Sequence, residues 1–299
     1  MSADEKTVTN EVTSTMTAAE QAAQHGLIRV GARPSFGSYL KQAWARRDFA
    51  YELAKSRLQA SNQRNRLGML WVVIKPTMNA LMYGFIFGIL LGGSRGPDFP
   101  SFVVIGVFLF EFFTGSANSG AKSITGNVAL VQSLSFPRIT LPIAAVVQQF
   151  LTLVPMLVVM FIYVTVLGTT PKASWLMIIP LLVLFSMFNM GVALVCARLT
   201  VHVRDFTQIL PVITRVLFFT SGVLFPIDRV LNAFPGLVRL FDFHPIYQTL
   251  LLARGSIMDG TEYQYPGFYW IVLSAWAVVM LVGGAIYFWA AEERYGRVD

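Results

Sequence analysis

The side chains that most often catalyse reactions or bind metals are few in this 299-residue chain, and they lie far apart. The three histidines are His25, His202 and His244, so no two of them have the spacing of metal ligands. Cys196, the one cysteine, lies inside an apolar run, where a small buried hydrophobic residue is the simpler interpretation. These positions predict neither a catalytic centre nor a metal or cofactor site on this chain.

One glycine-rich stretch partly resembles a phosphate-binding loop. It runs from Gly115 through Gly120 to Lys122 and Ser123. One residue too many separates Gly120 from Lys122, no soluble strand precedes the stretch, and it adjoins a long apolar run. We therefore expect no nucleotide site here. If the chain takes part in active transport, the energy must come from another polypeptide.

The composition predicts the environment that the chain occupies. Hydrophobic residues make up 55% of the sequence and charged residues only 13%, whereas soluble domains carry about 25% charged residues. Most of the charge lies before residue 67 or in short clusters between apolar runs. Because the basic residues adjoin those runs, the net charge of +7 favours contact with anionic membrane lipid over nucleic acid. We therefore expect an all-α integral membrane protein.

Six stretches are apolar and long enough to cross a bilayer as helices. They fall at about 69–92, 101–121, 142–167, 174–198, 207–227 and 268–290. Lys and Arg are concentrated in the segments that share a side with the N-terminus, which predicts that this side is cytosolic. An even number of spans returns the C-terminus to the same side. The expected location is the plasma (inner) membrane, in a multi-pass arrangement.

Two segments before the first span have different characters. Residues 1–35 are polar and predict a disordered cytosolic tail. Residues 36–66 carry apolar side chains at helical spacing, which favours an amphipathic helix on the inner membrane surface over an ordinary solvated helix. These apolar positions are Phe36, Leu40, Trp44, Tyr51, Ala54 and Leu58. Residues 67–299 would then form one six-span transmembrane domain.

Two connections are neither spans nor simple loops. Residues 122–138 contain a short helical pattern followed by Phe136-Pro137-Arg138, which suits either a partner contact or a plain linker. Residues 226–266 are apolar but interrupted by proline and glycine. Backbone at membrane depth must be helical or covered by protein, so we expect short re-entrant helices there. An outer loop lying on the lipid is the alternative.

Three charged residues fall inside predicted spans, at Lys75, Glu111 and Arg215. A lone charge at mid-bilayer costs about 2.5–3.5 kcal/mol on insertion scales, so a partner or water is expected. Glu111 and Arg215 fall at nearly the same predicted depth. We therefore expect Glu111 to pair with Arg215 or with Lys75. A structural role is favoured over a proton relay, because no chain of ionisable groups crosses the membrane.

Five motifs occur in the order that a known family has them. They are "RLGMLWVVIKP" with Leu67, Gly68, Trp71 and Pro76, then "SLSFPRITLP", "HVRDF", "FFTSGVLFPID" and "HPIYQTLLLARG". Together they resemble the ABC type-2 exporter permeases of the polysaccharide and polyol-phosphate group, over about residues 36–290. The sequence departs from the family in having Phe110 and Glu111 where Pro-Trp is common, and His244 where Asn usually precedes Pro245.

The resemblance implies a homodimer with a channel at its interface, lined by the first and fifth spans. Two cytosolic ATPase subunits, which carry ATP and Mg, would dock on the 36–64 helix and the 122–138 segment. The cargo would be a lipid-pyrophosphate-linked glycan. Cell-wall galactan, teichoic acid and O-antigen are the candidates. The implied ATPase-coupling residues are Asn127, Phe136, Pro137, Arg138, Arg204 and Asp205.

The resemblance also implies residues for the channel. Aromatic rings suit sugar faces, although the same rings could simply face lipid or other helices. The lining candidates are Tyr83, Phe87, Phe218 and Phe219. Arg64 and Arg66 at the inner mouth could attract pyrophosphate or anchor the inner leaflet. The implied outer gate contains Pro235, Gly236, Pro245 and Arg254.

Two other functions remain open from the sequence. A small-molecule or drug exporter would have the same architecture with a narrower channel. An integral membrane glycosyl or acyl transferase would need carboxylates or histidines that converge at the membrane surface, and the sequence contains no evident set of this kind.

Overall fold

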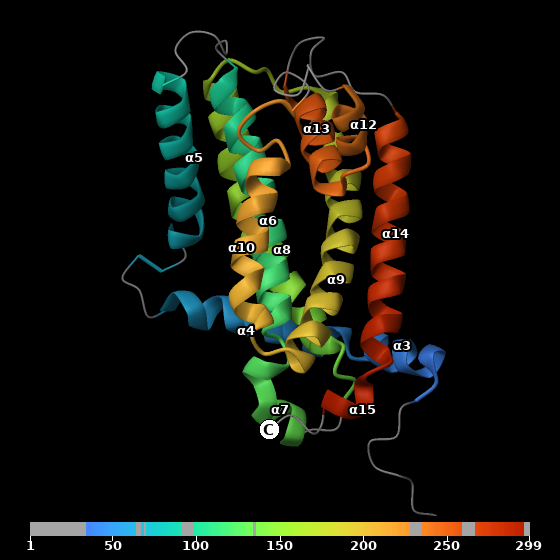
Figure 1. Ribbon diagram of the computed structural model, residues 1–299. Coiled ribbons are helices and arrows are strands. Elements are labelled where there is room, and N and C mark those ends of the chain that lie inside the picture. Colours follow the sequence, from blue (N-terminus) through green and yellow to red (C-terminus); the bar gives the residue numbers. More distant parts are fainter. Residues whose placement is uncertain are drawn as a thin grey trace, which may run out of the picture. The chain divides into compact units, whose positions relative to one another are not determined.

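The computed structural model describes residues 34–63, 67–68, 70–90, 98–133, 136–227, 235–258 and 267–295. The predicted tail at 1–35 lies almost entirely outside these residues, as do Arg64 and Arg66. Within the described ranges every regular element is a helix, which confirms the all-α class. Figure 1 shows the long helices running side by side, with short helices gathered at each end.

Among the residues that the structure describes, four helices are long and apolar enough to cross a membrane. They are α6 (Phe99–Ala121), α8 (Thr140–Val166), α9 (Ile178–His202, preceded by the 3₁₀ helix η2, Ala173–Met177) and α14 (Phe268–Trp289). Even the shortest of these spans, with 22 residues, covers about 33 Å at 1.5 Å per residue, enough for a core about 30 Å thick. They coincide with four of the predicted spans, so the chain is membrane-embedded.

Helices also occupy the other two predicted spans. They are α5 (Leu70–Leu90), with 21 residues, and α10 (Phe206–Thr220), with 15 residues. At the same rise α10 covers only about 22 Å, because the chain turns at Gly222, where φ is +71°. Both helices pack on α6. The count of six spans therefore stays a prediction.

The predicted interfacial helix is two helices, α3 (Phe36–Ala45) and α4 (Arg47–Gln63), with a break at Arg46. They lie across one end of the long helices, and we call this the α4 end (Figure 1). The buried positions are Tyr39, Ala43, Ala50, Ala54 and Leu58. Leu40, Trp44 and Tyr51 of the predicted apolar stripe are exposed, and their contact with the membrane surface stays a prediction.

Two short helices, α12 (Pro235–Phe241) and α13 (Pro245–Ile257), lie at the opposite end, which we call the α13 end (Figure 1). Both are too short to span. Helix α13 is buried along most of its length against α6, α9, η2 and α14. It is thus covered by protein, which is the condition that re-entrant backbone must meet. The alternative of an outer loop lying on lipid does not fit α13.

Glycines let the long helices approach closely. A Cβ atom built on Gly191 of α9 would lie only 2.1 Å from the main-chain oxygen of Met280 in α14. One built on Gly284 of α14 would lie 2.6 Å from the oxygen of Gly191. On another side of α9, a Cβ on Gly120 of α6 would lie 2.5 Å from the Cβ of Ala193. Small residues therefore set the packing of α9 between α6 and α14.

Candidate coupling site

A second hydrophobic cluster, separate from the core between the spans, lies at the α4 end. It joins Tyr39 of α3 and Phe136 and Ile139, which precede α8, to Phe288 of α14 and Tyr295 of α15 (Glu292–Tyr295). The ring centroids of Phe288 and Tyr295 are 4.5 Å apart, and the Tyr295 hydroxyl donates to the oxygen of Phe288 at 2.9 Å. This cluster encloses the most connected polar group of the region.

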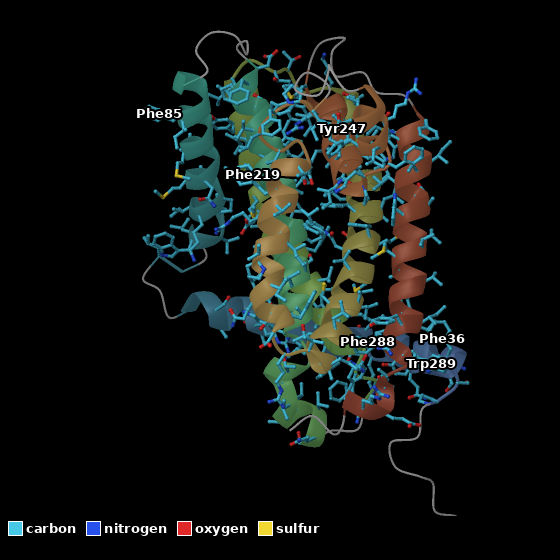
Figure 2. The ribbon with its side chains drawn as sticks, in the orientation of Figure 1. Phe36, Phe85, Phe219, Tyr247, Phe288 and Trp289 are labelled. Carbon is cyan, nitrogen blue, oxygen red and sulfur yellow. The ribbon has the colours of Figure 1, made fainter. Side chains whose placement is uncertain are left out.

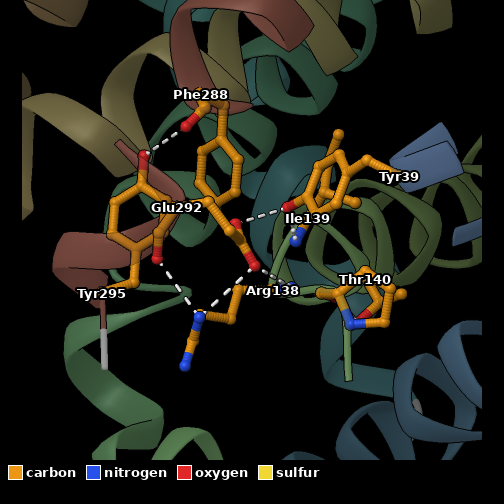
Figure 3. A network of polar contacts seen from close by, with 8 residues as sticks. Tyr39, Arg138, Ile139, Thr140, Phe288, Glu292 and Tyr295 are labelled. Atoms are coloured by element: carbon orange, nitrogen blue, oxygen red, sulfur yellow. Dashed lines mark hydrogen bonds and ion pairs between the residues drawn. The ribbon is translucent and has the colours of Figure 1, made fainter. Parts of the chain in front are cut away.

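That group is the carboxylate of Glu292, which is only 5% exposed (Figure 3). The Tyr39 hydroxyl donates to its Oε2 at 2.5 Å, and the Arg138 amide donates to its Oε1 at 3.1 Å. The Arg138 guanidinium forms an ion pair with Oε1 at 3.5 Å and donates to the main-chain oxygen of Glu292 at 3.1 Å. The Tyr39 hydroxyl also accepts from the Ile139 amide at 3.1 Å. One carboxylate therefore ties three segments of the chain together.

Burial controls the protonation of this network. Burial raises the pKa of Glu292, while the hydrogen bonds from Tyr39 and Arg138 and the charge of Arg138 oppose that rise. Burial, followed by the nearby charge of Glu292, raises the pKa of Tyr39 well above its usual range. Tyr39 therefore stays protonated at physiological pH and remains the donor in its bond to Glu292.

The same end contains a second polar link, between α4 and the 122–138 segment. The segment forms the 3₁₀ helix η1 (Thr125–Asn127) and α7 (Val128–Ser133). Arg57 of α4 donates from Nη2 to Oδ1 of Asn127 at 2.8 Å, and Asn127 donates to the oxygen of Ser123 at 2.7 Å. The rings of Phe49 and Phe136 add an apolar contact, with their centroids 5.5 Å apart. Helix α4 thus holds the segment at both of its ends.

These contacts change the interpretation of the predicted coupling residues. Phe136 and Pro137 are buried, Asn127 is partly buried, and the side chain of Arg138 is only 19% exposed. These side chains help to position the segment, and their role in coupling to a partner stays a prediction. The exposed surface of the segment is supplied by other residues, among them Lys122, Gly126 and Ala129.

The remaining two coupling candidates, Arg204 and Asp205, lie in the exposed turn between α9 and α10. The main-chain oxygen of Asp205 accepts from the amides of Gln208 and Ile209, as expected at a helix start. Neither residue is part of the Glu292 network described above.

Sequence reasoning missed Tyr39, Arg57 and Glu292. Tyr39 and Glu292 are 253 residues apart, and Arg57 and Asn127 are 70 residues apart. The one local signal was an acidic pair, Glu292 and Glu293, directly after the last apolar span. A carboxylate next to a span is the natural partner for a buried arginine.

The predicted intramembrane charges share an unusual surface. Lys75 of α5, Glu111 of α6 and Arg215 of α10 are all exposed. Within the described residues, Glu111 forms an ion pair with neither Arg215 nor Lys75. Since charges facing hydrocarbon are costly, this surface of α5, α6 and α10 must face water or protein.

Only part of the predicted aromatic lining is open. Phe219 of α10 is 45% exposed, whereas Phe218 packs against Phe110 with ring centroids 5.2 Å apart. Figure 2 shows Phe219 on α10 and a further exposed ring, Phe85, on α5. The side chains of Tyr83 and Phe87 lie outside the described residues.

The predicted outer gate contains a structural anchor at the α13 end. Arg254 is fully buried and donates to the main-chain oxygens of Gly222 and Val223 at 2.9 Å each, and to that of Phe102 at 3.1 and 3.3 Å. Its guanidinium carbon lies 3.3 Å from the centroid of the Phe102 ring. Arg254 thus ties α13 to α6 and to the chain after α10.

The other gate candidates lie on α12 and α13. Pro245 is the first residue of α13, and His244 caps that helix by accepting the Tyr247 amide at Nδ1. Burial lowers the pKa of His244, which keeps this acceptor free of a proton. Gly236 is exposed on α12, and the side chain of Pro235 lies outside the described residues.

Comparisons with known proteins agree with this architecture. The profile of the family described as "ABC-2 type transporter" matches residues 51–258. An O-antigen export system permease protein of Klebsiella pneumoniae is 25% identical over 257 residues, which cover 84% of this chain and 95% of that protein. A protein of the same name from Myxococcus xanthus is 26% identical over 64% of this chain and 73% of its own length. A polysialic acid transport protein of Escherichia coli is 23% identical over 65% of this chain and 75% of its own length.

Proposed function

Because the chain belongs to the ABC-2 type transporter family, we propose that it is the permease subunit of an ATP-driven polysaccharide exporter. The membership confirms the resemblance that the motifs predicted. The similar proteins are named for the export of O-antigen and polysialic acid, both of which are glycans. We infer a lipid-pyrophosphate-linked glycan as cargo, with cell-wall galactan, teichoic acid and O-antigen as candidates.

The observation that carries this proposal is the exposed charged surface of α5, α6 and α10. A second copy of the chain, related by a two-fold axis, would cover this surface and leave a polar path between the two copies. Lys75, Glu111 and Arg215 would then face water rather than lipid, and the exposed rings of Phe85 and Phe219 would offer flat surfaces to sugars. In this arrangement all six helices span the inner membrane.

The Glu292 network supports the coupling part of the proposal. Two ATPase subunits, which bind ATP and Mg, would dock at the α4 end on the exposed surface of the 122–138 segment. The buried contacts of Arg138 with Glu292 and of Asn127 with Arg57 would pass the motion of the ATPases to α14 and α4. Both termini would then lie in the cytosol.

A small-molecule exporter is the second candidate, since it would share the architecture. The names of the similar proteins favour a glycan. An integral membrane transferase is a weaker candidate, because the polar groups of the cluster at the α4 end form hydrogen bonds with one another rather than facing a substrate.

The function is tested by depleting the chain in its own cells and following radiolabelled sugar in lipid-linked and surface glycan. We expect surface glycan to fall and the lipid-linked glycan to accumulate inside the cell. Adding back the chain together with its ATPase should restore export, whereas an ATPase unable to hydrolyse ATP should not. Unchanged surface glycan after depletion, or a loss of glycan synthesis without accumulation, would contradict the proposal.

The homodimer predicts a specific cross-link. Phe85 lies 15 residues from the start of α5 and Phe219 lies 13 residues from the start of α10, which is about 22 and 20 Å along the respective helix. Both variants are built on Cys196→Ala, since Cys196 is the one native cysteine. We expect two differently tagged copies, one with Phe85→Cys and one with Phe219→Cys, to form a disulfide-linked dimer on mild oxidation.

The matched control pairs Phe85→Cys with Val279→Cys, an exposed position on α14. This pair should remain monomeric on a non-reducing gel. A cross-link of equal yield in the control pair would mean that the copies collide at random, and the dimer interface would have to be placed elsewhere.

The internal contacts of the coupling site predict a loss of stability. Tyr39→Phe removes the donor to Glu292 and the acceptor for the Ile139 amide, and it leaves two buried polar groups unsatisfied. At about 1–3 kcal/mol for each such group, we expect a clear drop in the thermal midpoint of the purified protein. Tyr51→Phe, at an exposed position of α4, is the control and should leave the thermal midpoint unchanged. Equal midpoints for both variants would show that the network adds nothing to stability.

A further inference from the structure

A cluster of cationic and polar side chains that the coupling site does not use lies at the α4 end of α14. Arg198 and His202 of α9 and Arg294 of α15 meet there around Tyr287 of α14. The Arg198 guanidinium carbon lies 3.9 Å from the centroid of the Tyr287 ring, and its Nη1 donates to the Tyr287 oxygen. Arg294 Nη1 contacts Nε2 of His202 at 3.1 Å.

The geometry fixes the proton on His202. A guanidinium can only donate, so Nε2 of His202 accepts from Arg294. The proton then sits on Nδ1, which donates to the oxygen of Arg198 at 2.9 Å. The ring is therefore neutral, and the cluster has two full positive charges held near each other by an imidazole.

The buried acidic residue beside this cluster is engaged elsewhere. Glu292 faces inward and is engaged by Arg138 and Tyr39. Glu293 is exposed and adjoins Arg294 in sequence. Within the part of the chain that the structure describes, the buried Nε of Arg198 has no hydrogen-bond acceptor. The cluster thus offers two cations to an anionic group from outside.

An apolar stripe leads directly to this cluster. Val279, Val282 and Ile286 are exposed along one side of α14 and extend about 12 Å from the level of Tyr287 toward the α13 end. A soluble acidic partner would cover the cations but would not reach this stripe. A phospholipid would cover both, because its acyl chains pack on the stripe while its phosphate reaches the cations.

We propose that Arg198, Arg294 and the neutral His202 form a binding site for the phosphate of an anionic phospholipid whose acyl chains lie along Val279, Val282 and Ile286. The phosphate oxygens accept from both guanidinium groups. The site lies on the outer side of α14, away from the surface of α5, α6 and α10 that the export proposal uses. It therefore stands independently of the cargo.

The test measures lipid binding to the purified chain by native mass spectrometry, with dioleoyl phosphatidylglycerol, dioleoyl phosphatidylcholine and inorganic phosphate as probes. We expect clear selection of phosphatidylglycerol over phosphatidylcholine. The double variant Arg198→Gln/Arg294→Gln should bind phosphatidylglycerol more weakly, by about fivefold for each lost charge. Arg198→Lys/Arg294→Lys keeps the charges and should retain most of the binding.

The control is Lys55→Gln/Lys122→Gln, which removes two exposed cations at the same end of the protein but away from α14. Its affinity for phosphatidylglycerol should equal that of the unaltered chain. Size-exclusion profiles establish that each variant is folded. A further variant, Val282→Asp, disrupts the apolar stripe alone and leaves the cations in place. That variant should also lose phosphatidylglycerol.

Three results would overturn the proposal. One is equal binding of both lipids by the unaltered chain. Another is competition by inorganic phosphate at the concentration of the lipid, which would mean a soluble anion as ligand. The third is unchanged lipid binding by the glutamine variant together with loss of ATPase association, which would make the cluster a protein docking surface.

Discussion

Gly284→Ala is expected to destabilise the protein strongly, while Gly283→Ala, one residue earlier on the same helix, is expected to be neutral or stabilising. A Cβ on Gly284 would lie 2.6 Å from the oxygen and 3.0 Å from the Cα of Gly191, and main-chain atoms cannot turn aside as a side chain can. A Cβ on Gly283 would meet no atom within 4 Å. The two helices must separate in one variant only.

The two substitutions are expected to change the free energy of unfolding in opposite directions. Overpacking costs about 1–3 kcal/mol or more, and here the whole α9–α14 contact is involved. Gly283→Ala gains up to about 1 kcal/mol from helix propensity. Gly191→Ala should destabilise the protein more than Gly284→Ala, because its Cβ would lie 2.1 Å from the Met280 oxygen. Thermal midpoints of the purified variants measure the order, and equal midpoints for Gly283→Ala and Gly284→Ala would contradict the close helix crossing.

Arg254→Met is expected to have an effect of similar size at the other end of the molecule. The change removes the hydrogen bonds of Arg254 to three main-chain oxygens, on Phe102, Gly222 and Val223, within a fully buried site. At about 1–3 kcal/mol for each oxygen left without a donor, we expect a loss of about 2 kcal/mol or more, with α13 released from α6. Export should fall with it.

Two further variants separate charge from geometry. Arg254→Lys keeps the charge, but one ammonium group cannot serve three oxygens with the fixed fork of a guanidinium, so only part of the stability should return. Arg239→Met on the exposed surface of α12 is the control and should behave as the unaltered chain. Protease accessibility of the α13 end reports the release. Full stability of Arg254→Met would show that the three oxygens find other donors.

The sequence predicted the long helices well, because a run of about 20 apolar residues has few stable alternatives in a membrane. It also located α13 and marked Arg254, although as part of a gate rather than as an anchor. It failed at α10, which was expected to continue to residue 227. Hydropathy continues through Val223 and Leu224, while the helix stops at the positive φ of Gly222. Composition does not encode that stop.

The contacts of the coupling site could not be predicted for a different reason. Periodicity placed Leu40, Trp44 and Tyr51 on the apolar face of the α3–α4 region, a surface that is exposed. The positions of α3 that are buried against the rest of the protein are instead Tyr39 and Ala43. Glu292 met Tyr39 and Arg138 only through the tertiary fold, since local spacing carries no information about partners so distant in sequence.

The bond between Tyr39 and Glu292 has a consequence for biosynthesis. Its two residues are among the first and the last of the described chain to leave the ribosome. Until Glu292 emerges, Arg138 and the Tyr39 hydroxyl lack the carboxylate that fixes the 122–138 segment. An ATPase that recognises the fixed segment would therefore bind chains in which Glu292 has emerged and pass over shorter nascent ones, so that translation itself would time the assembly of the exporter.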